Sequence, residues 1–304
     1  MSDLHISFAG VSFRNPVVLN SGTCGFGEEV SHFFPLSAIG GLCLKALTLL
    51  PRLGNKPPRV AEAPSGMVNS VGLQNPGVEA FLRETLPWLQ KQDTRLIANI
   101  SGSCAEDYAK LAAMLDDTAV DMLEVNVSCP NVKAGGMAFG TDPAMTEQIT
   151  AAVKENARRL PVIVKLSPAV TSIARIAKAA QNGGADALSL INTLPAMRID
   201  VRTHRPVLAN NTGGLSGPCV LPVAVRAVYE AAQSTGLPIL GMGGVSSGKD
   251  AAELMLAGAS LIGVGTALLK DPEAPVKIVR ELNELADEQH LEQVSQLVGA
   301  VRLW

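Results

Sequence analysis

The sequence predicts an α/β fold, a (β/α)8 TIM barrel preceded by a short N-terminal β-hairpin. Eight apolar runs recur along the chain, each closed by small or polar residues, as is typical of buried parallel strands. Amphipathic stretches with helical spacing lie between most of these runs, so the chain is a series of βα units. Its 304 residues, 47% of them hydrophobic, fit one large domain, residues 1–304, better than two ordinary ones. The eight runs are residues 17–22, 41–47, 96–100, 122–128, 162–167, 187–193, 238–244 and 261–268.

The other elements follow in chain order. Residues 4–8 and 11–13 alternate apolar and polar side chains around Ala9 and Gly10, which predicts a hairpin that plugs one end of the barrel. Asp271 is a candidate N-cap, so the closing helix is predicted over residues 272–288. No element is assigned to residues 291–303. The remaining predicted helices are residues 105–115, 143–159, 172–182, 221–234 and 248–257.

A doubly wound open sheet is the alternative fold. It usually has fewer strands, and the chain has no Gly-x-Gly-x-x-Gly turn after its first predicted strand. The barrel therefore agrees better with the pattern.

Composition excludes several classes of function. The formal net charge of −3 gives no electrostatic sign of nucleic-acid binding, which would need a basic face. The N-terminus lacks a basic segment followed by an apolar one, and no apolar run reaches the roughly 18 residues that span a bilayer. We therefore expect a cytoplasmic protein without nucleic-acid or membrane partners. The five cysteines are scattered and form no C-x-x-C pair, which argues against disulfides, a zinc site or an iron–sulfur cluster within this chain.

Polar residues gather where the predicted strands end, and the reacting groups of a (β/α)8 barrel come from that rim. Amides, hydroxyls and two lysines are found there, where a purely structural rim would carry solvated charges at random. The pattern predicts a binding site, although any single member could serve only to satisfy a loop backbone. The strand ends carry Asn20, Ser21, Gly22, Thr23, Lys45, Ala46, Leu47, Thr48, Asn99, Asn126, Cys129, Lys165, Asn192 and Thr193.

Glycines close the last two predicted strands, at Gly243, Gly244 and Gly265, the last followed by Thr266. Glycine lets the backbone approach a ligand closely, and the loops after strands seven and eight are the usual phosphate site of this fold. Gly217, in the glycine-rich segment 213–217, could add a further N–H group to the same anion. A phosphate without a nucleotide signature, above amides and lysines, indicates FMN.

The two lysines suit that cofactor. Lys165 could stabilise the negative charge that reduction places on an isoalloxazine ring, and Lys45 could do the same or bind an anionic substrate. The alternative for each lysine is an ordinary salt bridge at the rim.

Cys129 stands in the segment Asn126-Val-Ser-Cys-Pro-Asn131, so a strand delivers a thiol and two amides to one place. A thiol, with a pKa of about 8.5 when free, acts as a general base only if that pKa is lowered or the proton is passed on. The alternative is a buried inert cysteine, the interpretation that we favour for Cys24, Cys43, Cys104 and Cys219. The four histidines are too scattered to form a metal site or a triad.

Segments 126–142, 69–77 and 191–194 closely resemble the dihydroorotate dehydrogenases, FMN barrels that oxidise (S)-dihydroorotate to orotate in pyrimidine synthesis. Within that family a cysteine base marks the soluble class 1 enzymes. Segments 199–202 and 212–218 resemble the NAD-linked class 1B catalytic subunit rather than the fumarate-linked homodimer. The resemblance implies that Cys129 takes the proton from carbon 5 of dihydroorotate while the hydride on carbon 6 passes to FMN.

The resemblance also implies two sets of binding residues. The substrate would be held by Lys45, Asn69, Ser70, Val71, Gly72, Leu73, Asn126, Asn131, Asn192 and Thr193. FMN would be held by Ser21, Gly22, Lys45, Ala46, Asn99, Asn126, Lys165, Ile191, Gly217, Gly243, Gly244, Gly265 and Thr266.

A partner is implied as well. Class 1B relatives work with a subunit that carries FAD and a [2Fe–2S] cluster and passes electrons to NAD⁺, in a heterotetramer built on a homodimer core. This sequence has no ligand pattern for FAD or for the cluster.

Three other functions stay open at this point: a dihydropyrimidine-dehydrogenase-like barrel that reduces uracil, a flavin-dependent tRNA-modifying enzyme, and a non-catalytic scaffold subunit. The tRNA enzyme should carry a basic surface and an RNA-binding extension, neither of which is apparent.

Overall fold

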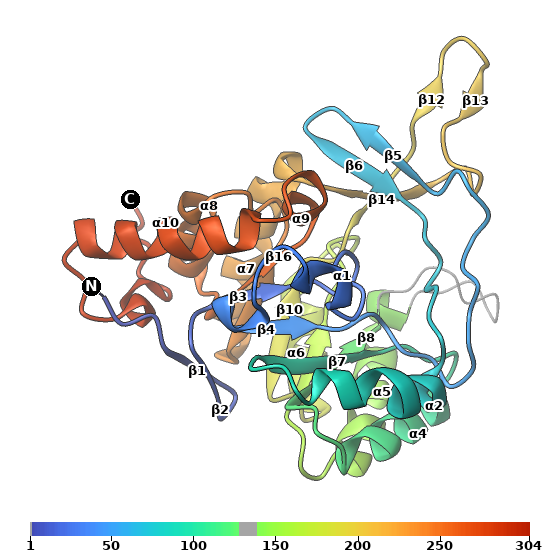
Figure 1. The fold of residues 1–304 in the computed structure, drawn as a ribbon, viewed down its shortest axis with the longest axis horizontal. Coiled ribbons are helices and arrows are strands. Elements are labelled where there is room, and N and C mark those ends of the chain that lie inside the picture. The colour runs from blue at the N-terminus through green and yellow to red at the C-terminus, as the bar shows by residue number, and fades with distance from the viewer. Residues whose placement is uncertain (1, 128–138) are drawn as a thin grey trace.

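Eight parallel strands form a closed barrel in the computed structural model, which describes residues 2–127 and 139–304. Their order around the barrel is β10-β15-β16-β3-β4-β7-β8-β9, which confirms the predicted (β/α)8 fold (Figure 1). Nearly every strand residue is buried, because the barrel core covers one face and the helices cover the other. The strands are β3 (Val17–Leu19), β4 (Gly41–Cys43), β7 (Arg95–Ile100), β8 (Met122–Asn126), β9 (Val162–Lys165), β10 (Ala187–Leu190), β15 (Ile239–Met242) and β16 (Leu261–Val264).

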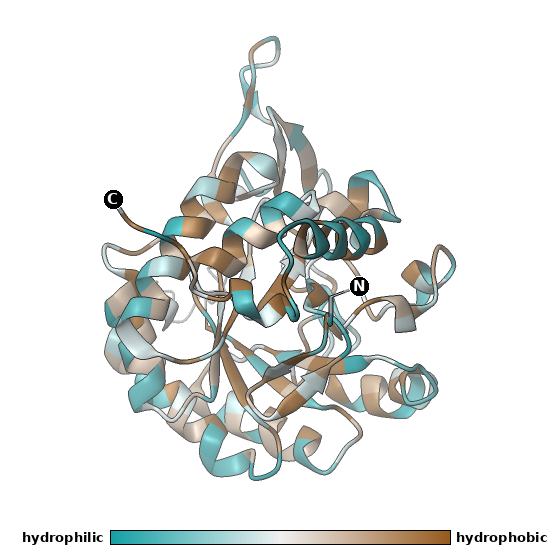
Figure 2. Ribbon diagram, turned by 90° about the vertical axis from the view of Figure 1, so that its left-hand side faces the viewer, coloured by the Kyte–Doolittle hydropathy of each residue, from teal (hydrophilic) through white to brown (hydrophobic). Residues whose placement is uncertain are grey.

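Six helices form most of the outer layer, and all six lie where the sequence predicts a helix. Side-chain oxygens of Asp142, Ser172 and Ser247 cap three of them by accepting backbone N–H groups of the first turn. Figure 2 shows the resulting layers, with hydrophobic barrel strands inside and hydrophilic residues on the outer helices. The helices are α4 (Ala105–Asp116), α5 (Pro143–Asn156), α6 (Ile173–Asn182), α7 (Leu221–Thr235), α8 (Gly248–Ala257) and α10 (Ala274–Glu288). None of the helices in the described ranges is long and apolar enough to cross a membrane.

Short helical turns connect these elements. They are α1 (Glu28–Ser31), η1 (Leu36–Ala38), α2 (Val78–Ala80), η2 (Phe81–Thr85), α3 (Leu86–Leu89), η3 (Phe139–Thr141), η4 (Pro218–Val220), α9 (Thr266–Lys270) and η5 (Val294–Leu297).

Several predicted boundaries differ from the structure. Seven of the eight strands end two to four residues earlier than predicted, and the helix predicted for residues 143–159 ends at Asn156. The eighth strand was predicted to continue to residue 268, but it ends at Val264 and the chain enters α9 at Thr266.

The closing helix begins at Ala274 rather than at residue 272. The prediction of Asp271 as the N-cap is wrong, because Glu273 is the N-cap residue of α10. The Asp271 carboxylate instead accepts the N–H of Glu273 over 3.1 Å, in the turn before the helix.

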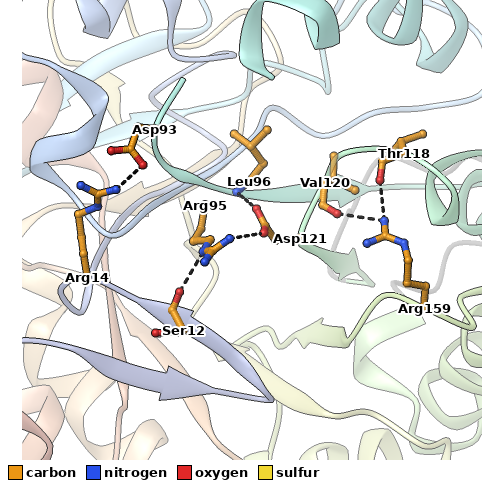
Figure 3. A network of polar contacts seen from close by, with 9 residues as sticks. All are labelled: Ser12, Arg14, Asp93, Arg95, Leu96, Thr118, Val120, Asp121 and Arg159. Carbon is orange, nitrogen blue, oxygen red and sulfur yellow. Dashed lines mark hydrogen bonds and ion pairs between the residues drawn. The ribbon is translucent and has the colours of Figure 1, made fainter. Parts of the chain in front are cut away.

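The N-terminal hairpin, β1 (Ile6–Phe8) and β2 (Val11–Phe13), closes the amino end of the barrel. Phe8 and Phe13 are fully buried and stack edge to face with ring centroids 6.3 Å apart. Arg95, the first residue of β7, donates from Nε to the Ser12 carbonyl over 2.9 Å and from Nη1 to Asp121 over 3.0 Å (Figure 3). The prediction of a plug at one end of the barrel agrees with these contacts.

The C-terminal tail packs against the same end of the chain. Val294 and Leu297 of η5 are buried, and the Val294 N–H donates to the Asp3 carbonyl over 2.9 Å. Residue 299 then donates its N–H to the carbonyl of Met255 at the end of α8. The unassigned tail thus ties α8 to the N-terminus.

A second sheet was not predicted. It has the order β11-β14-β6-β5 and lies beyond the carboxyl ends of the barrel strands, with a further two-stranded arm beside it (Figure 1). These strands are short, partly exposed and rich in glycine and proline, so they produce no apolar run in the sequence. They are β5 (Val60–Ala63), β6 (Gly66–Asn69), β11 (Leu194–Ala196), β14 (Gly213–Ser216), and in the arm β12 (Ile199–Asp200) and β13 (Arg205–Pro206).

Candidate active site

A cavity of about 1220 Å³ opens at the carboxyl ends of the barrel strands, between the barrel rim and the second sheet. Most of the residues predicted to bind substrate or cofactor line it. These are Ser21, Gly22, Lys45, Ala46, Asn69, Ser70, Val71, Gly72, Leu73, Asn126, Lys165, Ile191, Asn192, Thr193, Gly217, Gly243, Gly244, Gly265 and Thr266.

Among the predicted substrate and cofactor residues that the structure describes, Asn99 alone is absent from this lining. Asn99 is fully buried, and its amide Nδ2 lies 3.5 Å from the Ser21 hydroxyl and also donates to Glu124, so it supports the lining from the barrel interior. Cys129 and Asn131 lie outside the described residues.

At the glycine-rich end of the cavity, the backbone has a conformation that residues with a side chain rarely adopt. Gly217, Gly243 and Gly244 have φ values of 104°, 124° and 86°, which L-residues rarely adopt. A Cβ on Gly244 would also lie 2.7 Å from the Leu221 backbone nitrogen. Thr266 donates from Oγ1 to the Ser216 hydroxyl over 2.8 Å, which joins the loop after β16 to the second sheet. This end presents bare backbone, as an anion site requires.

The segment 69–73 forms another wall, held by two asparagines beside it. Asn55 donates from Nδ2 to the Ser70 carbonyl over 2.8 Å, and Asn75 donates from Nδ2 to the Leu73 carbonyl over 2.7 Å. The Ser70 hydroxyl is buried without a hydrogen-bond partner among the described residues. Such an orphan hydroxyl in a cavity wall is suited to a ligand.

Beneath the cavity, the fully buried carboxylate of Glu124 on β8 connects four other strands. Its Oε2 accepts hydrogen bonds from the Cys43 thiol over 3.0 Å and from the Asn99 amide, and its Oε1 accepts from the Ser189 hydroxyl over 2.6 Å. The Lys165 ammonium lies 3.7 Å from Oε2, with its side chain 8% exposed. Lys165 thus lies between this buried cluster and the cavity.

Charge in this cluster is distributed unequally. Burial opposes ionisation of Glu124, but the Lys165 ammonium and the three hydrogen bonds outweigh it and hold the pKa of Glu124 below its ordinary value. Burial and the Glu124 carboxylate together raise the pKa of Cys43 well above its ordinary value. Burial raises the pKa of Cys24 to about 12. Both thiols are therefore neutral near pH 7, in agreement with the inert interpretation. Cys104 and Cys219 are exposed, so the prediction that they are buried is wrong.

Sequence reasoning missed Glu124 as a member of the site. A signal was present, because Glu124 is the only charged residue in the run 122–128. A carboxylate inside a strand that is buried on both faces needs a partner, and Lys165 stands at the end of the neighbouring strand β9.

The fold and the site define a class of protein: a (β/α)8 barrel with a ligand cavity at its carboxyl ends, lined by lysines, amides and bare glycine backbone. A family model described as "Dihydroorotate dehydrogenase" matches residues 3–286. The chain belongs to the dihydroorotate dehydrogenase family.

Curated relatives match over nearly the full length. A protein of Desulforudis audaxviator named "Dihydroorotate dehydrogenase B (NAD(+)), catalytic subunit" is 53% identical, over 97% of this chain and 96% of its own. A protein of Anoxybacillus flavithermus with the same name is 49% identical, over 100% of this chain and 97% of its own. Among solved structures, a complex of DHODH with ferulenol from Eimeria tenella has a TM-score of 0.82 at 22% identity, over 98% of this chain and 88% of that one, which is a likeness of fold.

Proposed function

We propose that the chain is the catalytic subunit of an NAD-linked dihydroorotate dehydrogenase that oxidises (S)-dihydroorotate to orotate in pyrimidine synthesis. The observation that supports it best is the meeting of Lys45, Lys165 and the glycine loops in one cavity. The names of the relatives that match the whole chain support the same activity.

The cavity fits FMN as the cofactor. Gly243, Gly244 and Gly265 line the cavity with backbone alone, which suits a phosphate. A Cβ at any of the three would meet the protein's own atoms at 3.1 Å or less, so the fold itself also requires glycine there. Asn20 is part of the lining, and its side-chain oxygen is buried without a hydrogen-bond partner among the described residues, so the protein alone does not satisfy this polar atom. The Lys165 ammonium suits the ring edge that becomes negative on reduction.

FMN, when bound, would supply the acceptor for the hydride from carbon 6 of the substrate. Lys45 would bind the substrate carboxylate, and Asn69, Asn126, Asn192 and Thr193 would pair with the ring amides, which present donors and acceptors in turn. The Asn126 carbonyl accepts from the Tyr108 hydroxyl over 2.8 Å, so the backbone of this residue is anchored.

Cys129 would remove the proton from carbon 5 as general base, and Asn131 would contact the substrate beside it. Ser70 to Leu73 would complete the substrate wall. The remaining cofactor contacts would come from Ser21, Gly22, Ala46, Ile191, Gly217 and Thr266, all in the cavity lining, and Asn99 would act from below it. Residues 1–304 would work as one FMN-binding domain.

A partner subunit would carry FAD and a [2Fe–2S] cluster and pass the electrons to NAD⁺, in a heterotetramer with a homodimer of this chain at its core. The support is the printed name of the relatives, a catalytic subunit of an NAD(+) enzyme.

The test is anaerobic mixing of the purified, flavin-loaded protein with dihydroorotate or with dihydrouracil. We expect dihydroorotate to bleach the flavin absorbance much faster than dihydrouracil does. Faster bleaching by dihydrouracil would indicate the dihydropyrimidine-dehydrogenase-like alternative. A colourless protein that takes up no added FMN would indicate a scaffold subunit.

A further inference from the structure

We propose that Glu124 is a positioning residue that offsets the charge Lys165 presents to the bound flavin and thereby lowers the flavin reduction potential. This inference rests on the proposed FMN site. It assigns a role to a carboxylate that lies behind the cavity lining.

The geometry separates Glu124 from the ligand and joins it to Lys165. Glu124 is fully buried and absent from the lining of the cavity, whereas Lys165 is part of that lining. The two charges are 3.7 Å apart, and the side chains are 0% and 8% exposed. Glu124 therefore acts on a ligand through its charge and through its effect on Lys165, and not by contact.

Hydrogen bonds fix the carboxylate in this position. Cys43 and Asn99 donate to one oxygen and Ser189 donates to the other, from strands β4, β7 and β10. The Asn99 amide also lies 3.5 Å from the hydroxyl of Ser21, which does line the cavity. A carboxylate held from three sides cannot turn away from the ammonium, so its charge stays opposite Lys165.

The direction of the effect follows from the charges. Two opposite charges at this separation in a buried site largely cancel at a distance. Without the Glu124 charge, the Lys165 ammonium would act on the flavin uncompensated and would favour the anionic reduced ring. The Glu124 carboxylate therefore makes the reduced flavin less stable than it would be beside Lys165 alone. A less stable reduced flavin passes its electrons more readily to the next acceptor.

The test measures the reduction potential of the flavin-loaded protein against an indicator dye of known potential. For Glu124→Gln we expect a higher potential, with the equilibrium constant for flavin reduction increased by about tenfold or more. In the Lys165→Met background the same substitution should move the potential much less, because a buried Glu124 without the ammonium favours the protonated, neutral form, so little charge is left to remove. An unchanged or lower potential in the single variant, or an equal rise in the Lys165→Met background, would overturn the proposal.

Two further variants keep the result interpretable. Thr150→Val removes a buried hydroxyl of α5, away from the cavity, and should leave the potential unchanged. If Glu124→Gln does not retain FMN, Glu124→Asp keeps the charge but draws it away from Lys165, and should still raise the potential. Wild-type protein that binds no flavin would refute the proposed function itself, whereas normal flavin binding with an unmoved potential would refute only the role of Glu124.

Discussion

The thiol of Cys43 donates a hydrogen bond to the carboxylate of Glu124 over 3.0 Å, inside the barrel and away from solvent. A thiol next to a fixed negative charge resists ionisation, and only the thiolate reacts with alkylating agents. This hydrogen bond therefore keeps the Cys43 thiol unreactive and holds the Glu124 carboxylate in place.

Cysteine reactivity follows from this contact. Cys24, with a pKa of about 12, and Cys43, with a pKa raised well above normal, should resist iodoacetamide in the native protein near pH 8. Exposed Cys219 should react within the same period, and peptide mass spectrometry distinguishes the sites. Denaturation should make all three equally reactive. Labelling of native Cys43 at the rate of Cys219 would contradict the buried hydrogen bond.

Lys165→Met should destabilise the protein by about 3–5 kcal/mol near pH 7, because it leaves a buried carboxylate without its charge partner. Lys154→Met is the matched control, since its 2.7 Å pair with Asp186 is partly exposed, and should cost at most about 1 kcal/mol. Denaturant unfolding of both variants measures the difference. Equal losses would mean that burial does not strengthen the Glu124 pair.

The same pair predicts a pH dependence. The folded pKa of Glu124 is lowered from 4.5, so its contribution to the free energy of unfolding is fully present above pH 4.5 and is lost as pH falls through the folded pKa. The stability gap between wild type and Lys165→Met should therefore be widest at neutral pH and should shrink below pH 4.5. A gap that stays constant down to acidic pH would show that the pKa is not lowered.

Gly244→Ala should weaken FMN binding by about tenfold or more, because the new Cβ would lie 2.7 Å from Leu221 and would displace the glycine loop. Gly236→Ala is the control, since its φ of 69° carries similar strain but no atom lies within 4 Å of the new Cβ. It should cost about 1–2 kcal/mol of stability and leave FMN affinity unchanged. Fluorescence titration with FMN compares the two, and equal affinities would argue against a phosphate at Gly244.

Cys129→Ala should retain FMN but slow flavin reduction by dihydroorotate about 10²–10⁴-fold, the usual contribution of a general base. Cys104→Ala, which removes an exposed thiol, should behave as wild type. Anaerobic stopped-flow mixing gives the rate. A normal rate in the first variant would remove Cys129 from the mechanism.

The sequence was sufficient to predict the barrel and most of the residues that line the cavity. Parallel strands covered on both faces must be apolar throughout, so each one is recognisable as a local run such as 162–165. The carboxyl ends of such strands all meet at one rim, so Lys45, Lys165 and Gly243 could be grouped before any distance was known.

Only the tertiary structure decided what depends on pairing between distant segments. The second sheet places Asn69 beside Gly214, and each strand alone is too short and too polar to be recognised. Asn99 lies beneath the cavity rather than in its lining because it bonds to Glu124. The sequence by itself determined which residues end the strands, whereas closure of the barrel decided which strands face one another and so gave Glu124 its partner Lys165.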